Sequence, residues 1–456
     1  MKTKYIFKAF ALMSVLCLST ACDKGFLDAK PKQEHLVPRT IADFQRIMDN
    51  FRIFVLNSAS GLMQISTDDF VISDEGLLEL QAEEIDAYRW ERDMSSINWD
   101  WSRSYGLIFH CNIVLEGLEA MPDEDKQKPE YRALRGSALF VRSNAFFDLS
   151  HSYSKPFDQT TAQTDPGIPL KVSADISERK GRGSVQECYA RIISDLKEAF
   201  ELLPVTTAYK TRPTKAAAQA LLARVYLSMA DFPNALQAAH AALQDRNELL
   251  DYKSIADNSV RSFPVPLPNN NPEILFYSEM PNYWFFLSGL TGVNPDLYAL
   301  YGPSDRRKKV FFTNQGGILN FKGSYSGAPQ LFAGLATDEL YLTRAECLAR
   351  AGRTIEALAD LNTLLRKRHD AGFIDLKITD PAELLRTILL ERRKELVGRG
   401  VRWFDLRRLN KEPALAQTLK RTVNGVERNL TPNDGRYVFL IPPIEISLNP
   451  MPQNER

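Results

Sequence analysis

The sequence predicts a mainly α-helical fold, built from tetratricopeptide-like helical repeats that long, loop-rich insertions interrupt. The first observation is an alanine-rich hairpin over residues 211–243, whose alanines recur at three- and four-residue spacing and let two helices approach closely. The second is that residues 340–368 repeat this pattern. The third is that the segment from Asp251 to Ala336 carries too many prolines and glycines for long helices.

The N-terminal segment has the three parts of a secretory signal: Lys2, Lys4 and Lys8, an apolar run over residues 9–18, and small residues before Cys22. The run of about ten residues is too short to span a bilayer, which takes roughly 20 residues of helix. The segment resembles a bacterial lipoprotein signal, in which Cys22 is acylated after cleavage at residue 21. The alternative is an ordinary secreted protein. Acylation with two or three chains would anchor the protein stably to a membrane.

After the signal we expect a single domain over residues 22–456, made of one interrupted helical array. A polar tether covers residues 22–38. The helical-repeat core takes about 97–153, 183–246 and 337–369, with Thr214 as the N-cap of the helix that begins at Lys215. A loop-rich insertion covers about 251–336, and a shorter insertion lies between Lys155 and Gly183. A helix and a C-terminal segment fill residues 380–456.

Composition and charge exclude several classes of function. The chain has 456 residues and balances 57 basic against 57 acidic side chains, so it lacks the basic excess that nucleic-acid binding needs. The cysteines at positions 17, 22, 111, 188 and 347 have no metal-ligand spacing, and Cys111, Cys188 and Cys347 are expected to be small buried side chains on helices. The histidines form no catalytic motif. We predict no enzyme activity, no cofactor and no metal site.

The region around residue 391 has an unusual arrangement of charge. Asp380, Pro381 and Glu383 predict an N-cap, a proline at the first helical position and a capping-box glutamate. The helix that follows ends at Gly398 and Gly400, and it places Arg392 on its apolar side. A buried charge needs a partner, and the candidates are Glu391, Glu395 and Asp405.

Two acidic clusters could in principle be catalytic. Glu391 and Glu395 are interleaved with arginines that would hold them ionised, so a structural ion-pair cluster is the favoured interpretation. Asp68 and Asp69, together with Asp74 and Glu75, could form a glycosidase pair or a calcium site. They have no EF-hand spacing, and neighbouring residues on a strand point to opposite faces, so a solvated loop is favoured.

Aromatic residues are the best functional lead. A sugar face laid on an indole or phenol ring covers about 100 Å², which contributes about 2.5 kcal/mol before the costs of binding. Aromatic residues gather before the first helical hairpin and again in the large insertion, and the alternative is that most of them belong to the core. The candidate ligand-binding residues are Arg89, Trp90, Asn98, Trp99, Trp101, Tyr283, Trp284, Tyr298 and Tyr301.

Three segments resemble the SusD/RagB family of nutrient-binding surface lipoproteins of Bacteroidetes. They are Phe26-Leu27-Asp28 with Pro31; the run 391–396 followed by Gly400, Arg402, Trp403, Asp405, Leu406 and Arg408; and the closing segment 440–454. Arg399 is a departure, since the family usually has an acid there. The resemblance identifies a structural signature of charged residues: Glu391, Arg392, Arg393, Glu395, Arg402 and Asp405.

The resemblance implies a SusD-like α-superhelix with a function in nutrient uptake. It implies a lipid-anchored protein of the outer membrane, facing the cell exterior, that binds an oligosaccharide or polysaccharide and acts as a lid on a SusC-like TonB-dependent transporter. The ligand platforms of this family are usually drawn from the two aromatic regions named above. A RagB-like peptide-binding protein, an envelope scaffold built from helical repeats and a surface hydrolase are the alternatives.

Overall fold

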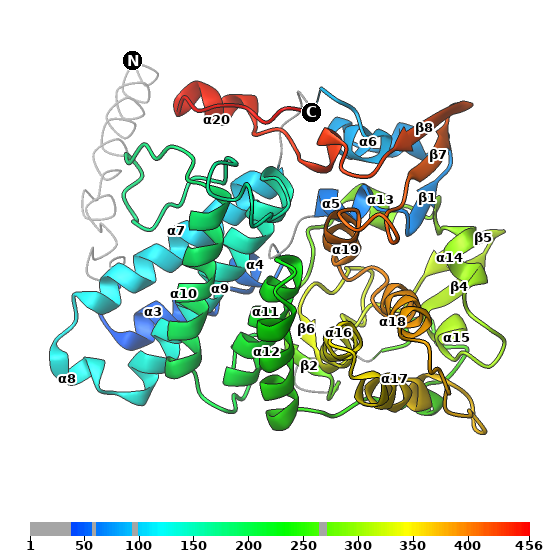
Figure 1. The fold of residues 1–456 in the computed structure, drawn as a ribbon. Helices are drawn as coiled ribbons and strands as arrows, with labels where there is room; N and C mark the ends of the chain where they lie inside the picture. The colour runs from blue at the N-terminus through cyan, green and yellow to red at the C-terminus, as the bar shows by residue number, and fades with distance from the viewer. Residues whose placement is uncertain (1–37, 57–60, 94–98, 264–270) are drawn as a thin grey trace, which may run out of the picture.

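The computed structural model describes residues 38–56, 61–93, 99–263 and 271–456. Its main feature is an array of long helices in which each helix packs against the next (Figure 1). In order of packing these are α7 (Trp99–Glu119), α9 (Pro129–Tyr153), α10 (Val185–Leu202), α11 (Lys215–Ser228), α12 (Phe232–Asp245), α16 (Thr337–Arg350), α17 (Thr354–Arg368) and α18 (Pro381–Glu395). The predicted mainly helical, tetratricopeptide-like fold is confirmed.

Two helices begin at the predicted N-caps, Thr214 and Asp380, but Glu383 does not complete the predicted capping box. The Thr214 hydroxyl accepts a hydrogen bond of 3.3 Å from the amide of Ala217, and the Asp380 carboxylate accepts one of 2.6 Å from the amide of Glu383. These bonds satisfy amide groups that have no partner within the helix. The small-residue faces of α11 and α12 are buried, with Ala223 and Ala239 at 1% and 0% exposed, so the two helices pack closely as expected.

Short helices and four two-stranded antiparallel sheets fill the rest of the described chain. The strand pairs are β1 (Phe70–Ile72) with β3 (Thr291–Val293), β2 (Ile274–Phe276) with β6 (Leu335–Ala336), β4 (Phe312–Gln315) with β5 (Ile318–Phe321), and β7 (Leu419–Val423) with β8 (Val426–Leu430). The short helices are α3 (Ile41–Met48), α4 (Phe51–Phe54), α5 (Gly61–Ile65), α6 (Ala82–Arg89), α8 (Asp123–Lys126), α13 (Trp284–Leu287), α14 (Pro295–Ala299), α15 (Arg307–Phe311), α19 (Arg402–Leu409) and α20 (Pro443–Leu448), with 3₁₀ turns η2 (Gly76–Glu79), η3 (Tyr252–Ser254) and η4 (Gly435–Tyr437).

Two of these strand pairs fix the large insertion in place. In the β1–β3 pair Val71 lies opposite Gly292, which fixes the middle of the insertion beside the N-terminal region. In the β2–β6 pair Ile274 lies opposite Ala336, which precedes α16 directly. The first pair therefore holds the insertion against the N-terminal region, and the second closes the insertion on itself at the start of α16.

The charged residues near α18 form a buried network. Arg392 pairs with Asp405 at 2.8 Å, one of its three expected partners. Glu391 and Glu395 instead face Arg307, at 2.5 and 3.0 Å. Although burial alone would raise it, the Arg392 and Arg408 guanidiniums hold the pKa of Asp405 below its ordinary value.

Two further arginines complete the cluster. Arg393 and Arg402 both pair with Asp68, at 2.8 Å each. Arg399, the departure from the family pattern, pairs with Asp338 at 3.0 Å. The six signature residues named from the sequence thus all take part in ion pairs of this network.

The expectation of a solvated loop at Asp68 and Asp69 is wrong. Asp69 is only 1% exposed, and Asp68 lies between Arg393 and Arg402, whose positions more than 300 residues along the chain no local pattern indicates. Burial, together with the adjacent Asp68 charge, raises the pKa of Asp69 to about 6. In the described part of the chain no group of His, Cys, Asp and Glu has the arrangement of a metal site.

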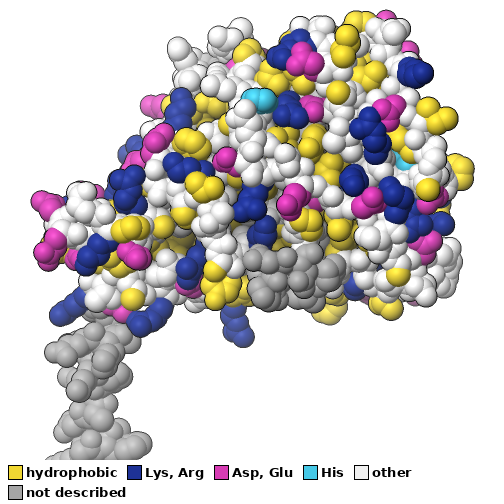
Figure 2. Space-filling model, turned by 90° about the horizontal axis from the view of Figure 1, so that it is seen from below, with side chains coloured by type: hydrophobic (Ala, Val, Ile, Leu, Met, Phe, Trp, Pro, Cys, Tyr) yellow, Lys and Arg dark blue, Asp and Glu magenta, His cyan; other side chains and the backbone are white. Residues whose placement is uncertain are grey.

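Cys111, Cys188 and Cys347 are buried on helices, as predicted. On the face shown in Figure 2, basic and acidic side chains are interspersed, and no single basic stripe crosses it. Within the ranges that the structure describes, no helix combines the length and apolar character that crossing a bilayer requires.

Candidate ligand-binding site

Trp99 and Trp284 are the most exposed of the predicted platform residues that the structure describes. Trp99 is 52% exposed at the start of α7, and Trp284 is 56% exposed at the start of α13. Single exposed apolar side chains are common on soluble proteins, so these two indoles are candidate ligand contacts because they are exposed and also lie in the two predicted aromatic regions.

The carboxylates of α6 hold the starts of both helices. The backbone amide of Trp99 donates to Oε2 of Glu83 at 3.2 Å, and that of Phe285 donates to Oε1 of the next residue, Glu84, at 2.9 Å. The hydroxyl of Tyr283 also donates to Oδ1 of Asp100 at 2.9 Å. Because the residues that flank the two indoles share these partners, Trp99 and Trp284 belong to one region of the surface although 185 positions separate them in the sequence.

Burial controls the charge of this carboxylate group. It raises the pKa of Glu83 to about 8, and the nearby charge of Asp100 acts in the same direction. Burial also raises the pKa of Glu84. Glu83 is therefore protonated at neutral pH, which removes repulsion between three acids that lie close together. Beside them, the Arg103 guanidinium lies 5.9 Å from the centre of the Trp99 ring, a cation–π contact that helps to orient the indole.

A small pocket of about 230 Å³ adjoins α13, two residues beyond Trp284. Phe70, Phe286 and Phe321 supply its apolar lining, and the rings of Phe286 and Phe321 each pack edge-on against Phe70. Thr291 and Asn320 add polar atoms, since the Thr291 hydroxyl and the Asn320 carbonyl oxygen are buried without a hydrogen-bond partner among the described residues. An apolar lining with a few convergent polar groups is typical of small-ligand sites.

Four of the other predicted platforms are buried, which corrects their expected role as ligand contacts. Trp90 donates from its indole N–H to the carbonyl of Ser66 at 2.9 Å, and the guanidinium of Arg421 lies 4.0 Å from its ring centre. Trp101 packs on Tyr105 and Tyr153, with ring centres 4.7 and 4.8 Å apart. Rings whose faces are covered in this way offer no platform to a ligand.

The two remaining buried platforms have structural partners as well. Tyr283 bonds to Asp100, as described above, and the Tyr301 hydroxyl donates to the carbonyl of Lys394 at 2.7 Å. Tyr298 is half-buried, with the ammonium of Lys308 4.6 Å from its ring centre, and Arg89 is half-buried on α6. Asn98 and the lipidation residue Cys22 lie outside the described residues.

Sequence reasoning missed Glu83, Thr291 and Asn320. Thr291 and Asn320 reach one pocket because β3 and β5 lie together, and neither position carries a local signal. Glu83 resembles any helical glutamate in the sequence. A pair of adjacent glutamates at the start of a short helix was the one available hint, and it is a common pattern at helix N-termini.

Two family models match the chain. One is described as starch-binding and associating with the outer membrane and matches residues 25–227; the other is described as the SusD family and matches residues 337–456. Among curated proteins, SusD-like protein P38 of Formosa agariphila is 25% identical over 381 residues, which cover 68% of this chain and 72% of the relative. SusD-like protein P2 of the same organism is 25% identical over 403 residues, covering 74% and 76%.

Solved structures share the fold across most of the chain. A SusD superfamily protein from Bacteroides thetaiotaomicron superposes with a TM-score of 0.74 at 22% identity, over 91% of this chain and 100% of the other. A surface glycan-binding protein A from Bacteroides fluxus superposes with a TM-score of 0.71 at 19% identity, over 91% and 99%. These structures show the shared fold, and the two family models together with the curated SusD-like relatives show that the protein belongs to the SusD/RagB family.

Proposed function

We propose that this protein is a non-enzymatic cell-surface lipoprotein that binds a glycan and delivers it, as a lid, to a partner SusC-like TonB-dependent outer-membrane transporter. The observation that carries the binding function is the pair of exposed indoles of Trp99 and Trp284, whose backbone segments are fixed by the hydrogen bonds from Trp99 to Glu83 and from Tyr283 to Asp100. Rigid aromatic rings bind sugar faces with little loss of side-chain entropy, which favours their use as platforms.

The expected affinity is modest. Two stacked rings contribute about 5 kcal/mol before the costs of association, and the polar groups of the adjoining pocket add specificity. A dissociation constant of about 1 mM already requires about 4 kcal/mol of net binding free energy, so the two rings alone are not sufficient and contacts with the pocket must supply the rest. We therefore expect weak, millimolar-range binding, which suits a protein that must release its ligand. The family description as starch-binding and the glycan-binding relative from Bacteroides fluxus support a glycan over a peptide.

The delivery step is proposed on the family membership. Anchoring at Cys22 would keep the protein at the outer membrane, with residues 22–38 as the tether. The family model that covers residues 25–227 describes association with that membrane. We expect a large outer-membrane barrel protein to co-purify with the full-length protein from a mild-detergent extract, and isolation without such a partner would contradict the lid function.

Binding is tested by calorimetry with panels of neutral glycans and of peptides. Trp99→Ala and Trp284→Ala should each weaken glycan binding at least tenfold. Tyr209→Ala is the matched control, because Tyr209 is also about half exposed and also stacks on an arginine, Arg212, outside the site. Binding of peptides alone would indicate the RagB-like function, no ligand at millimolar concentration would favour an envelope scaffold, and a hydrolysed glycan would establish an enzyme.

A further inference from the structure

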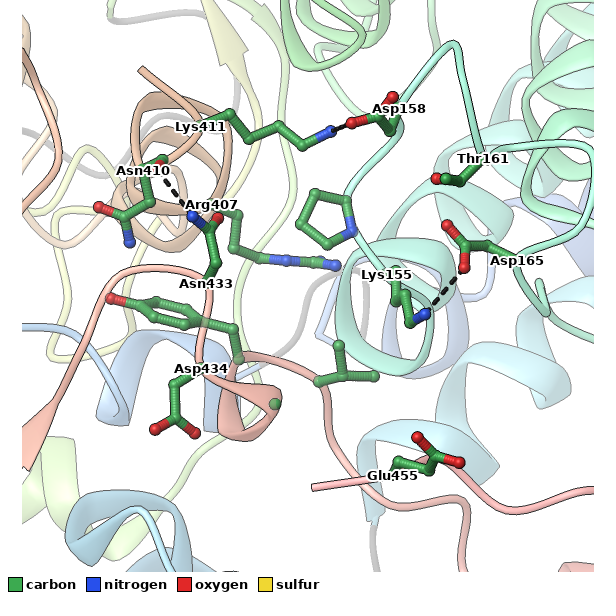
Figure 3. A pocket seen from close by; sticks show the side chains of 14 residues that line it. Lys155, Asp158, Thr161, Asp165, Arg407, Asn410, Lys411, Asn433, Asp434 and Glu455 are labelled. Atoms are coloured by element: carbon green, nitrogen blue, oxygen red, sulfur yellow. Dashed lines mark hydrogen bonds and ion pairs between the residues drawn. The ribbon is translucent and has the colours of Figure 1, made fainter. Parts of the chain in front are cut away.

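A second pocket, of about 490 Å³, lies between the loop that follows α9, the end of α19 and the C-terminal segment (Figure 3). Its lining includes Lys155, Asp158, Asp165, Arg407 and Lys411. None of these residues belongs to the tryptophan site, and the proposed function leaves the pocket unexplained. Its volume is in the range of small-molecule sites.

Arg407 is the unusual residue of this pocket. Its side chain is buried, with only 3% of the residue exposed, yet among the described residues no carboxylate forms an ion pair with it. Its two terminal nitrogens donate to the carbonyls of His151 and Ser154, at the C-terminal end of α9, and its Nε–H has no partner among the described atoms. Burial lowers the pKa of Arg407 to about 10, and the side chain is still a cation at neutral pH.

Two lysines flank Arg407, and each already has an acid. Lys411 contacts Asp158 at 2.6 Å, and Lys155 contacts Asp165 at 2.9 Å; Figure 3 shows the two pairs on different sides of the Arg407 guanidinium. The oxygens of Asp158 also accept from the amide and hydroxyl of Thr160, at 2.9 and 2.6 Å. The carboxylate of Asp158 is thus largely engaged. Lys411 uses two of its three N–H donors, because it also donates to the carbonyl of Phe157 at 2.8 Å, so it keeps one donor for another acceptor.

The other acids of the pocket do not neutralise Arg407. Asp434 binds the guanidinium of Arg436 at 2.7 Å, and Glu455 is exposed at the rim, where solvent screens its charge. The inner wall therefore presents N–H donors of one buried and two flanking cations. Interaction with a charge is strongest where water is excluded, which here is the position beside Arg407.

From this arrangement we infer that the pocket is a second binding site, which takes a ligand group with an oxyanion, either the carboxylate of an acidic sugar or a sulfate ester. That the oxyanion is part of a glycan rests on the proposed function. The cations Arg407, Lys155 and Lys411 favour an anion over a neutral sugar. This preference does not depend on Trp99 or Trp284.

The test is calorimetric titration of the purified protein with sodium glucuronate, sodium sulfate and methyl glucoside, at low ionic strength. Wild type should bind glucuronate or sulfate, and whichever anion binds better identifies the source of the group. Lys155→Gln and Lys411→Gln should weaken that binding at least threefold, and Arg407→Gln at least tenfold. Binding should also weaken as salt is added.

Matched controls separate this site from the proposed function. Lys309→Gln removes another surface lysine, which lies on α15 and pairs with Asp257 at 3.1 Å. This variant should leave anion binding unchanged. Trp99→Ala should also leave it unchanged, although it abolishes glycan stacking. Arg407 also caps the C-terminal end of α9, so a thermal melt must show that Arg407→Gln is folded. The two lysine variants keep this cap and therefore test the site without disturbing α9.

Three outcomes would overturn the inference: no heat from either anion at 20 mM, equal binding of methyl glucoside, or full binding in all three pocket variants. If the wild type bound the anion but no neutral glycan, or if Trp99→Ala and Trp284→Ala left neutral-glycan binding unchanged, only the proposed function would be contradicted.

Discussion

Glu83 is a buried acid that accepts a hydrogen bond from the backbone of an exposed platform residue, Trp99. Because its pKa is raised to about 8, its contribution to stability is complete below the ordinary carboxyl pKa and is lost as the pH rises through about 8. Above that pH a new charge appears beside Asp100 and Glu84. We therefore expect the glycan affinity of the wild type to fall between pH 7 and 9.5.

Glu83→Gln keeps the acceptor for the Trp99 amide but cannot ionise, so its affinity should stay constant over the same range. Calorimetry at four pH values makes the comparison, and Glu124→Gln, an exposed position on α8, serves as the control because its affinity should change with pH as that of the wild type does. A parallel fall in both Glu83→Gln and wild type would contradict this account.

At the scale of single residues the sequence predicted which aromatics could bind but could not separate the exposed ones from the core. Trp99 and Trp101 are two positions apart in the sequence, yet one is 52% and the other 3% exposed. They lie about 200° apart around a helix, so the burial of one face exposes the other. Which face is buried depends on the C-terminal segment, where Glu445 meets the Trp101 indole at 3.4 Å, and no local pattern contains that information.

At the scale of elements, Arg307 shows how the insertion is fixed to α18. Its guanidinium is completely buried and contacts Asp305, Glu391 and Glu395, from α18 and from the loop before α15. Burial alone would raise the pKa of Asp305 and Glu391, but Arg307 holds both below their ordinary values. Arg307→Leu leaves these acids without that partner and should destabilise the fold by about 3 to 5 kcal/mol at pH 7.

Acid should reduce this loss. The stabilisation from acids with lowered pKa values is present above their ordinary pKa and disappears as the pH falls, because the unfolded chain then binds more protons. Urea unfolding at pH 7 and pH 4 should therefore show a smaller difference between Arg307→Leu and wild type at pH 4. Arg353→Leu, which breaks an exposed pair with Glu356, should cost less than about 1 kcal/mol at either pH. A loss for Arg307→Leu that does not depend on pH would argue against the ion pairs as its cause.

The sequence predicts where the helices begin, but it does not predict which distant residues form ion pairs with their charged side chains. The caps at Thr214 and Asp380 are local signals, and the helices begin where those signals indicate. The partner of Arg392 was among the three candidates because Asp405 follows closely in sequence. Arg307 lies more than 80 residues before its partners in α18, and only the packing of the insertion on the helical array brings them together.

At the scale of the whole molecule, the candidate ligand-binding site exists because two distant segments meet. The start of α7 follows the N-terminal region, and α13 lies in the insertion that the β1–β3 and β2–β6 pairs hold in place. The sequence indicated both aromatic regions, but the pocket beside α13 and the carboxylates of α6 depend on tertiary packing. A helical array that forms without the insertion would therefore carry only half of the binding site.

The hydrogen bond from Tyr283 to Asp100 is the direct link between these segments, so its removal tests the assembled site. Tyr283→Phe keeps the ring in its packing position and removes only the hydroxyl that donates at 2.9 Å. We expect a stability loss of about 1 to 3 kcal/mol, because a buried carboxylate loses a donor, and a three- to tenfold loss of glycan affinity, because Trp284 is the next residue. Tyr252→Phe removes a hydroxyl that contacts Tyr325 at 2.8 Å elsewhere in the insertion, and it should lower the melting temperature without changing affinity. If the two variants lost affinity equally, the effect would come from general destabilisation, and the link between α7 and α13 would have no specific part in binding.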